Sequence, residues 1–223
     1  QGKFPLKWED QGKFLMDGND PRMEWKDFIP NEHNASTLNP KRGFVSSANQ
    51  HSVDPSYPYY VFDNSFEHYR NRRLNEKLRL MENIRIEDMM GLQFDNYHLH
   101  AAEALPVMLN LIQADTLIAQ GNPNSDYLKS LMAWDFYTNP SQKEPTMFDL
   151  WWRYLNSSVW EDFINSEKPV VLPHKYQTVK LLQNEPKSPL FDKKSTDKLE
   201  IAVDHVLESF DSMIVAVEKF KAE

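Results

Sequence analysis

The chain has 223 residues, of which 40% are hydrophobic and 26% charged, a balance typical of one or two folded globular domains. Its net charge of −8 makes nucleic acid an unsuitable partner, because binding there depends on neutralising phosphates. Cysteine is absent, which excludes disulfides and thiolate metal sites, and no apolar run approaches the roughly 18 residues of a membrane span.

Composition changes near residue 63. Before it, glycines and prolines separate short apolar runs, and the runs 4–8, 13–16 and 43–48 predict strands. After it, glycine nearly vanishes and helical periods take over. We therefore expect an α+β fold that is predominantly helical, with a β-rich segment over residues 1–62 and a bundle-like helical region over residues 63–223.

The first helix has a start signal, since Asn64 and Glu67 form a pattern resembling a capping box. Its apolar stripe also carries Arg70. The apolar members of that stripe are Phe66, Leu74, Leu78 and Met81. A charged residue among them is a feature that needs an explanation.

A second helix is predicted over about 86–105, with Pro106 expected to kink or break it before helix resumes toward Ala119. The final helix is predicted over about 196–221, capped by Thr196. Shorter helices are expected near 124–135, 145–155, 157–165 and 174–183.

A few residues could carry metal or nucleophile chemistry. His98 and His100 would point in different directions on a helix, and His100 with Glu103 supplies only two ligands, so a helix-surface role is favoured over a metal site. None of the internal serines lies in a sequence context that suggests an activating base.

Asn49 follows the predicted strand 43–48. A carboxamide at a strand end can donate an N–H group into an active site. The same residue can instead close the strand with an Asx-turn, and the local sequence by itself favours that simpler interpretation.

Arg70 is costly on an apolar helix face unless its guanidinium is paired or reaches the solvent edge. It can extend to the edge, or it can bind a buried carboxylate, carbonyl or other polar group. The residues alone support both equally. In a complete protein we expect a guanidinium at least half buried and bonded to a backbone carbonyl or a carboxylate.

Several motifs together resemble the penicillin acylase (penicillin amidase) family. They occur in order along the chain: Asn39-Pro40, Gly43-Phe44-Val45, Ala48-Asn49-Gln50, Tyr57-Pro58-Tyr59 and Tyr69-Arg70-Asn71-Arg72-Arg73. Trp25 with Phe28-Ile29-Pro30 lies upstream, and Gln93-Phe94-Asp95 lies downstream. The match runs in order through about residue 112 and continues more loosely to the last helix. Its specific part is Asn-Pro-x-x-Gly with the following Ala-Asn, and the helical part is much less specific.

The resemblance implies an N-terminal nucleophile hydrolase with αββα architecture, which cleaves the amide bond of N-acyl compounds. In that family an N-terminal serine attacks the carbonyl, its own α-amine acts as base, and an Asn side chain helps to hold the oxyanion. The matching positions make Asn49 the oxyanion donor and Arg70 the residue that orients the site. Residue one is Gln1, so the segment would lie inside the nucleophile-bearing chain, and we expect the isolated chain to be inactive.

The resemblance also implies the partners. These are the remainder of the acylase, namely its α chain and the missing parts of its β chain, and a small N-acyl substrate, in a periplasmic or extracellular setting. No cofactor is expected in this chain. Calcium is possible in the full-length enzyme, but the nearest candidate, Asp63, has the wrong spacing and is not assigned. The alternative is a non-enzymatic helical binding or scaffold domain that keeps the acylase pattern.

Overall fold

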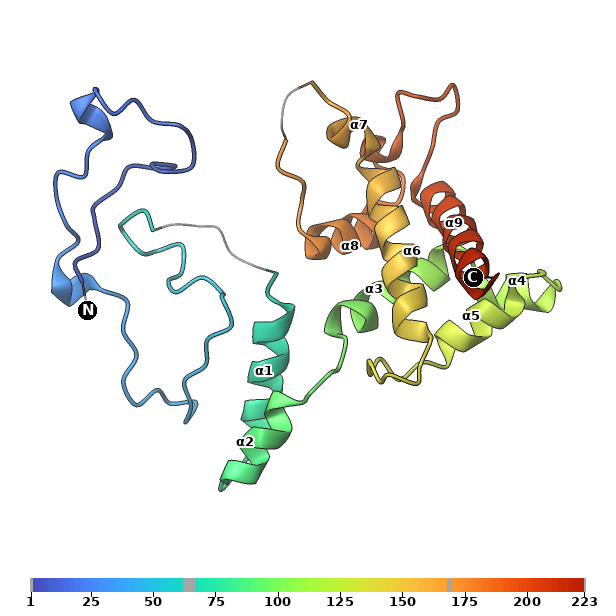
Figure 1. Cartoon of the computed structure of the whole chain (residues 1–223), viewed down its shortest axis with the longest axis horizontal. Coiled ribbons are helices and arrows are strands. Elements are labelled where there is room, and N and C mark those ends of the chain that lie inside the picture. The colour runs from blue at the N-terminus through green and yellow to red at the C-terminus, as the bar shows by residue number, and fades with distance from the viewer. Residues whose placement is uncertain (1, 62–66, 168–169, 223) are drawn as a thin grey trace. The chain divides into compact units, whose positions relative to one another are not determined.

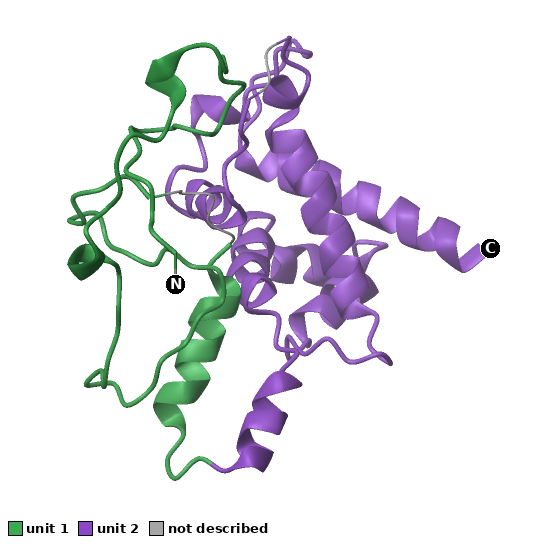
Figure 2. Ribbon diagram, turned by 60° about the vertical axis from the view of Figure 1, so that its left-hand side comes forward, with its two compact units in different colours: residues 1–84 green, residues 85–223 purple. Residues whose placement is uncertain are grey.

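A computed structural model describes residues 2–61, 67–167 and 170–222. The chain divides into two compact units, unit 1 over Gln1–Ile84 and unit 2 over Arg85–Glu223, which Figure 2 shows in different colours. Composition changes near residue 63, whereas the division between the units follows the first long helix. Asn64 and Phe66, which the sequence assigns to the start of that helix, lie outside the described residues.

Unit 1 is mostly irregular, and its described residues form no strand. Backbone pairing is limited to isolated bridges such as Pro5 with Phe28 and Lys7 with Tyr60. A regular ladder cannot extend there, because Pro5 has no N–H to donate. Regular elements in the described part are two 3-10 turns, Pro21–Met23 and Asn31–His33, and the helix α1, Tyr69–Leu80.

The predicted β-rich segment is therefore wrong for the described part of 1–62, and this part shows no layer of an αββα fold. Residues 43–48 illustrate the reason. The carbonyl of Phe44 accepts from Arg42 Nε at 2.9 Å, and the N–H of Ala48 donates to Gln50 Oε1 at 2.7 Å. Side chains satisfy these backbone groups, so the segment stays extended without pairing to a neighbouring strand.

Unit 1 buries few apolar side chains. Among its described residues, Ile29, Tyr69 and Leu78 are the buried hydrophobic ones. The larger exposed hydrophobic residues include Phe4, Trp8, Phe14, Leu15, Trp25, Phe28, Leu38 and Val45. Its conformation relies instead on polar contacts such as those of buried Gln11, which accepts from the Trp8 N–H and donates to the Met23 carbonyl. An irregular segment with so little core needs further contacts to be stable.

Unit 2 is helical, as predicted. Its elements in chain order are α2 (Ile86–Gln93), α3 (Leu99–Leu111), α4 (Ala114–Ala119), α5 (Ser125–Met132), α6 (Glu144–Val159), α7 (Glu161–Ile164), α8 (Lys175–Asn184), a 3-10 turn (Pro189–Phe191) and α9 (Ala202–Ala222). None of the helices in the described ranges combines the length and apolar character that crossing a bilayer requires.

The core of unit 2 is built around α6 and α9, which lie side by side (Figure 1). Trp151 of α6 is fully buried, and its ring centroid lies 4.9 Å from that of Phe210 of α9. Its indole N–H also finds acceptors in α9, the Val206 carbonyl and Ser209 Oγ, each at 3.1 Å. A buried tryptophan whose N–H is hydrogen-bonded removes a large apolar area from water and also fixes how the two helices lie against each other.

The single helix predicted over 86–105 is wrong, because two helices occupy this region. Between α2 and α3, Tyr97 forms an isolated bridge with Tyr137, and the His98 N–H donates to the Phe136 carbonyl at 2.7 Å. These partners hold the backbone extended, so the helix cannot continue. The pairing comes from residues about 40 positions away, which a local pattern does not reveal.

Pro106 lies inside α3 and does not break it. The proline is on the exposed face, while Ala104, Leu105 and Met108 are buried on the other side. Burial of these neighbours offsets the roughly 3 kcal/mol that an interior proline costs a helix. Tertiary packing therefore decides the outcome at this position.

The last helix begins later than predicted. Thr196 does not cap it, since its hydroxyl donates to Glu200 Oε1 at 2.6 Å, and α9 starts at Ala202 instead. The carboxylate of Asp204 accepts from the Ile201 N–H at 2.9 Å, which satisfies an N-terminal donor of the true helix start.

Candidate active site

The two residues that the sequence selects for catalysis are in direct contact. Arg70, in the first turn of α1, donates from Nη2 to Oδ1 of Asn49 at a distance of 2.6 Å. The residues are 21 positions apart, and both are exposed in this chain. The short distance is typical of a charge-assisted hydrogen bond. The fold thus brings together the proposed oxyanion donor and the proposed orienting residue.

This contact fixes the orientation of the Asn49 carboxamide. A guanidinium can only donate, so the atom facing it must be the oxygen, and Nδ2 with its two protons points elsewhere. Asn49 has a φ of +64°, a left-handed conformation that asparagine tolerates better than most residues. Because Oδ1 accepts from Arg70 and not from a nearby backbone N–H, the contact does not support the Asx-turn interpretation.

Arg70 is exposed in this chain, and its partner in this contact is a side-chain carboxamide. The expectation of a half-buried guanidinium bonded to a backbone carbonyl or a carboxylate concerns the complete protein and stays a prediction. The side chain extends from α1 to the loop that carries Asn49. The sequence left open whether Arg70 extends to the solvent edge or binds a polar group. In this chain the side chain does both, because it is exposed and contacts Asn49.

Further contacts hold the loop of residues 42–50 against α1. Asn71 donates from Nδ2 to Gln50 Oε1 at 3.0 Å. Asn75, which is buried, accepts at Oδ1 from Arg42 at 3.1 Å and from Ser46 at 3.2 Å. The sequence analysis did not select the two asparagines of α1 as functional residues. Their spacing of four positions was the available signal, because it places both on one helix face.

A groove of about 880 Å³ lies beside these contacts within unit 1. Its walls are mainly hydroxyl and carboxamide side chains, including Ser46, Gln50, Asn71 and Asn75. The wall is polar and carries few charges. Such a surface is suited to uncharged hydrogen-bonding groups, whether those of a substrate or those of another part of the protein.

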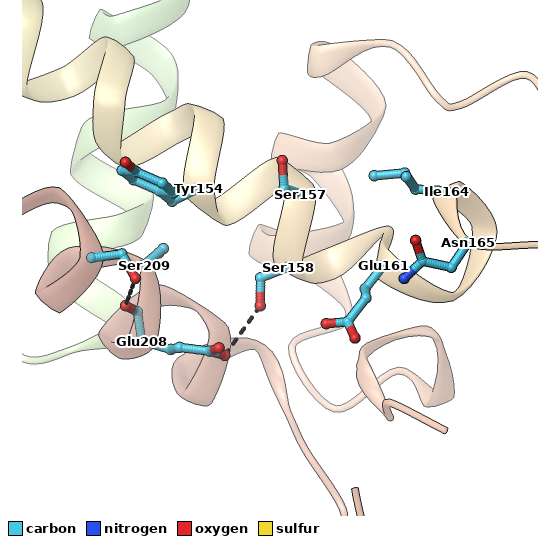
Figure 3. A pocket seen from close by; sticks show the side chains of 9 residues that line it. Tyr154, Ser157, Ser158, Glu161, Ile164, Asn165, Glu208 and Ser209 are labelled. Carbon is cyan, nitrogen blue, oxygen red and sulfur yellow. Dashed lines mark hydrogen bonds between the residues drawn. The ribbon is translucent and has the colours of Figure 1, made fainter. Parts of the chain in front are cut away.

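A second pocket, of about 360 Å³, lies within unit 2 between α6, α7 and α9 (Figure 3). Ser158 on its wall is 2.8 Å from His205 Nδ1, and His205 Nε2 is 2.6 Å from the Phe191 carbonyl. Since that carbonyl can only accept, Nε2 carries a proton. Burial lowers the pKa of His205 and so favours the neutral ring, in which Nδ1 accepts from the serine. This is the geometry of a serine with a base, which the sequence context did not suggest.

The electrostatic surroundings argue against a nucleophilic role for Ser158. Its Oγ lies 3.2 Å from Glu208 Oε2, as the dashed line in Figure 3 marks, and Glu161 also lines the pocket. Ser158 also lies near the C-terminal, negative end of α6. An oxyanion formed here would face two carboxylates, of whose charges Lys193 offsets only one, and a negative helix end. We therefore interpret the Ser158–His205 pair as a structural link between α6 and α9.

The histidines considered for metal binding have structural roles. His98 caps α3 by accepting from the Ala101 N–H at 3.1 Å, and its Nε2 is 3.3 Å from Asp149 Oδ1. His100 is buried, with its ring centroid 4.3 Å from Trp152, so its predicted helix-surface position is wrong. Burial, with smaller effects from Lys175 and His98, lowers the pKa of His100 to about 3. Within the described ranges, no three His, Asp or Glu residues converge to bind a metal ion.

Comparison with known proteins identifies the family of the chain. A curated relative, penicillin acylase 2 proenzyme from Pseudomonas sp. (strain SE83), is 24% identical over 136 residues. That match covers 60% of this chain and 17% of the relative, so the chain corresponds to a small part of that proenzyme's length. The family model described as penicillin amidase matches residues 1–222. The chain therefore belongs to the penicillin amidase family.

Proposed function

We propose that this chain is a segment of an N-terminal nucleophile amidohydrolase that cleaves the amide bond of N-acyl substrates. Within that enzyme, Asn49 donates a hydrogen bond to the oxyanion and Arg70 orients Asn49. The observation that carries the proposal is the 2.6 Å contact from Arg70 Nη2 to Asn49 Oδ1, in a segment that belongs to the penicillin amidase family.

The proposed chemistry is acyl transfer. A serine hydroxyl, supplied by a part of the acylase outside this segment, attacks the amide carbonyl while its α-amine takes the proton. The carbonyl π electrons move to oxygen, and this oxyanion accepts from Nδ2–H of Asn49. Collapse of the intermediate re-forms the carbonyl and expels the amine, which takes the proton from the α-ammonium group and leaves an acyl ester on the serine. Water then hydrolyses this ester, which releases the acid and regenerates the serine. Arg70 holds Oδ1 of Asn49 and places a positive charge near the oxyanion.

The proposed macromolecular partner is the remainder of the acylase. Unit 1 exposes large apolar residues such as Trp8, Leu15 and Leu38 while burying few. The matched relative is a proenzyme of which this chain covers 17%. Both facts support the interpretation that other parts of the same enzyme cover this surface and supply the nucleophile.

The test is Asn49→Ala in the full-length acylase that contains this segment. Loss of one oxyanion donor lowers kcat by roughly 10²–10³, or about 3–4 kcal/mol. KM changes little, because the charge on oxygen develops only in the transition state. Steady-state kinetics on the folded, processed enzyme gives both values.

Asn39→Ala is the matched control. Asn39 is also an exposed loop asparagine of unit 1 with a positive φ, +46° against +64° for Asn49, but the described residues show no arginine in contact with it. The control reports the cost of placing alanine in a left-handed conformation. A processed Asn49→Ala enzyme with the kcat of the Asn39→Ala enzyme would contradict the proposal and favour the scaffold alternative.

A further inference from the structure

The contacts between α1 and the 42–50 loop extend beyond the pair Arg70 and Asn49. Among the described contacts, Arg70 contacts Asn49, Asn71 contacts Gln50, and Asn75 contacts Ser46. Only the first contact involves the proposed oxyanion donor. The second is made by the neighbouring residues in both segments, so it fixes the backbone next to Asn49.

The direction of the Asn71–Gln50 hydrogen bond is determined by a third group. The backbone N–H of Ala48 can only donate, and it lies 2.7 Å from Oε1 of Gln50. Oε1 is therefore an acceptor, and the group of Asn71 that faces it at 3.0 Å must be the donor Nδ2. Gln50 cannot be turned around without placing its own NH₂ against the Ala48 N–H.

Asn75 restrains the other end of the same loop. Its Oδ1 accepts from Arg42 and Ser46, and its Nδ2 donates to the Asn71 carbonyl at 2.7 Å, so its orientation is also fixed. Asn75 is only 7% exposed, which makes these contacts part of the small interior of unit 1. The loop is thus attached to α1 on both sides of the turn that leads to Asn49.

We infer that Asn71 is a positioning residue, which acts through Gln50 to hold the Asn49 carboxamide in place. This inference rests on the proposed function of Asn49. Asn71 has no contact with Asn49 itself among the contacts of the described residues, so its effect passes through the loop backbone. Catalysis is sensitive to such placement, because an oxyanion donor acts only within hydrogen-bond distance of the reacting oxygen.

The test is Asn71→Asp in the full-length acylase. Aspartate has nearly the same shape as asparagine, but when ionised it cannot donate to Gln50. We expect kcat to fall about 5- to 10-fold with little change in KM, the usual range for one lost hydrogen bond. Glu76→Gln is the matched control, since Glu76 is an exposed residue of α1 whose ion pair with Arg73 is local.

A double-mutant cycle with Asn49→Ala separates positioning from general stability. If Asn71 acts through Asn49, adding Asn71→Asp to the Asn49→Ala enzyme has no further effect on kcat. An additive loss would overturn the inference while leaving the proposed function intact. A normal kcat for Asn49→Ala alone would overturn the proposed function, and the inference with it.

Gln50→Met provides a second variant that does not change α1. It removes the acceptor of Asn71 and also the acceptor of the Ala48 N–H. We therefore expect it to lower kcat at least as much as Asn71→Asp, and adding Asn71→Asp to it should have no further effect. This variant also decides the question if Asn71→Asp does not fold. A Gln50→Met enzyme with unchanged kcat would contradict the role of the Asn71–Gln50 contact.

Discussion

Replacing Arg70 in three ways separates its two proposed contributions to catalysis. Arg70 donates to Asn49 at 2.6 Å, and in the proposed mechanism this bond orients Asn49 while the charge of the guanidinium lies near the oxyanion. Arg70→Lys keeps a positive charge and a donor. Arg70→Gln keeps a donor without charge, and Arg70→Met keeps neither. All three side chains are unbranched and suit a helix, so α1 is expected to tolerate each of them.

The size of the charge effect follows from the geometry. The contact with Asn49, the width of the carboxamide and a second hydrogen bond place the oxyanion about 7 Å from the guanidinium, where Coulomb's law gives roughly 1–2.4 kcal/mol at an effective dielectric constant of about 40 to 20. This corresponds to a loss of roughly 7- to 60-fold in kcat for Arg70→Gln. Arg70→Met is expected to lose a few-fold more, because the amide of Asn49 can then turn over. Arg70→Lys is expected to lose least.

The assay is kcat and KM for each variant of the full-length acylase, together with its melting temperature as a measure of folding. We expect kcat to decrease from the natural enzyme to the Lys, the Gln and then the Met variant, with KM nearly constant. If Gln and Lys variants have equal kcat, the charge makes no contribution at this distance. If all three variants match the natural enzyme, Arg70 neither orients nor stabilises the site, and the reasoning from the Asn49 contact fails.

Two further predictions concern stability. Burial lowers the pKa of His100 to about 3 in the folded state, while the unfolded chain takes up the proton near 6.5. The unfolding free energy therefore decreases as the pH falls from about 6.5 toward 3, by up to about 1.4 kcal/mol per pH unit. His100→Phe removes this term, and its unfolding free energy is expected to fall less steeply with acid than that of the natural protein; parallel pH profiles would exclude the effect. Pro106→Ala restores the N–H that α3 lacks at an exposed position, so it is expected to raise the unfolding free energy by about 1–3 kcal/mol in denaturant titrations, and an unchanged midpoint would contradict a cost for Pro106.

The sequence predicts unit 2 better than unit 1 for a physical reason. Helices such as α6 and α9 have apolar periodicity that depends on local spacing, and the buried residues Val206, Phe210 and Met213 of α9 follow one another at steps of four and three. The extended segments of unit 1 have strand-like composition, but whether they pair depends on distant partners. There, side chains bond to backbone N–H and carbonyl groups, and prolines have no N–H to donate. No strand ladder forms in the described part.

The candidate site shows the same limit. The resemblance selects Asn49 and Arg70, and the structure places them in contact. Asn71 and Asn75 carry no comparable signal, since an asparagine on a helix is ordinarily a solvated residue. Their importance depends on the loop that faces them, about 20 to 30 positions earlier in the chain.

The pairing of α6 with α9 also has a consequence for synthesis on the ribosome. Trp151 obtains its indole acceptors and the Phe210 contact from α9, and Ser158 contacts His205 in the same helix. These partners are made some 50 residues after α6, so the core of unit 2 stays incomplete until α9 leaves the exit tunnel. A nascent chain stalled before α9 would expose the surface of Trp151 and depend on chaperones to stay soluble.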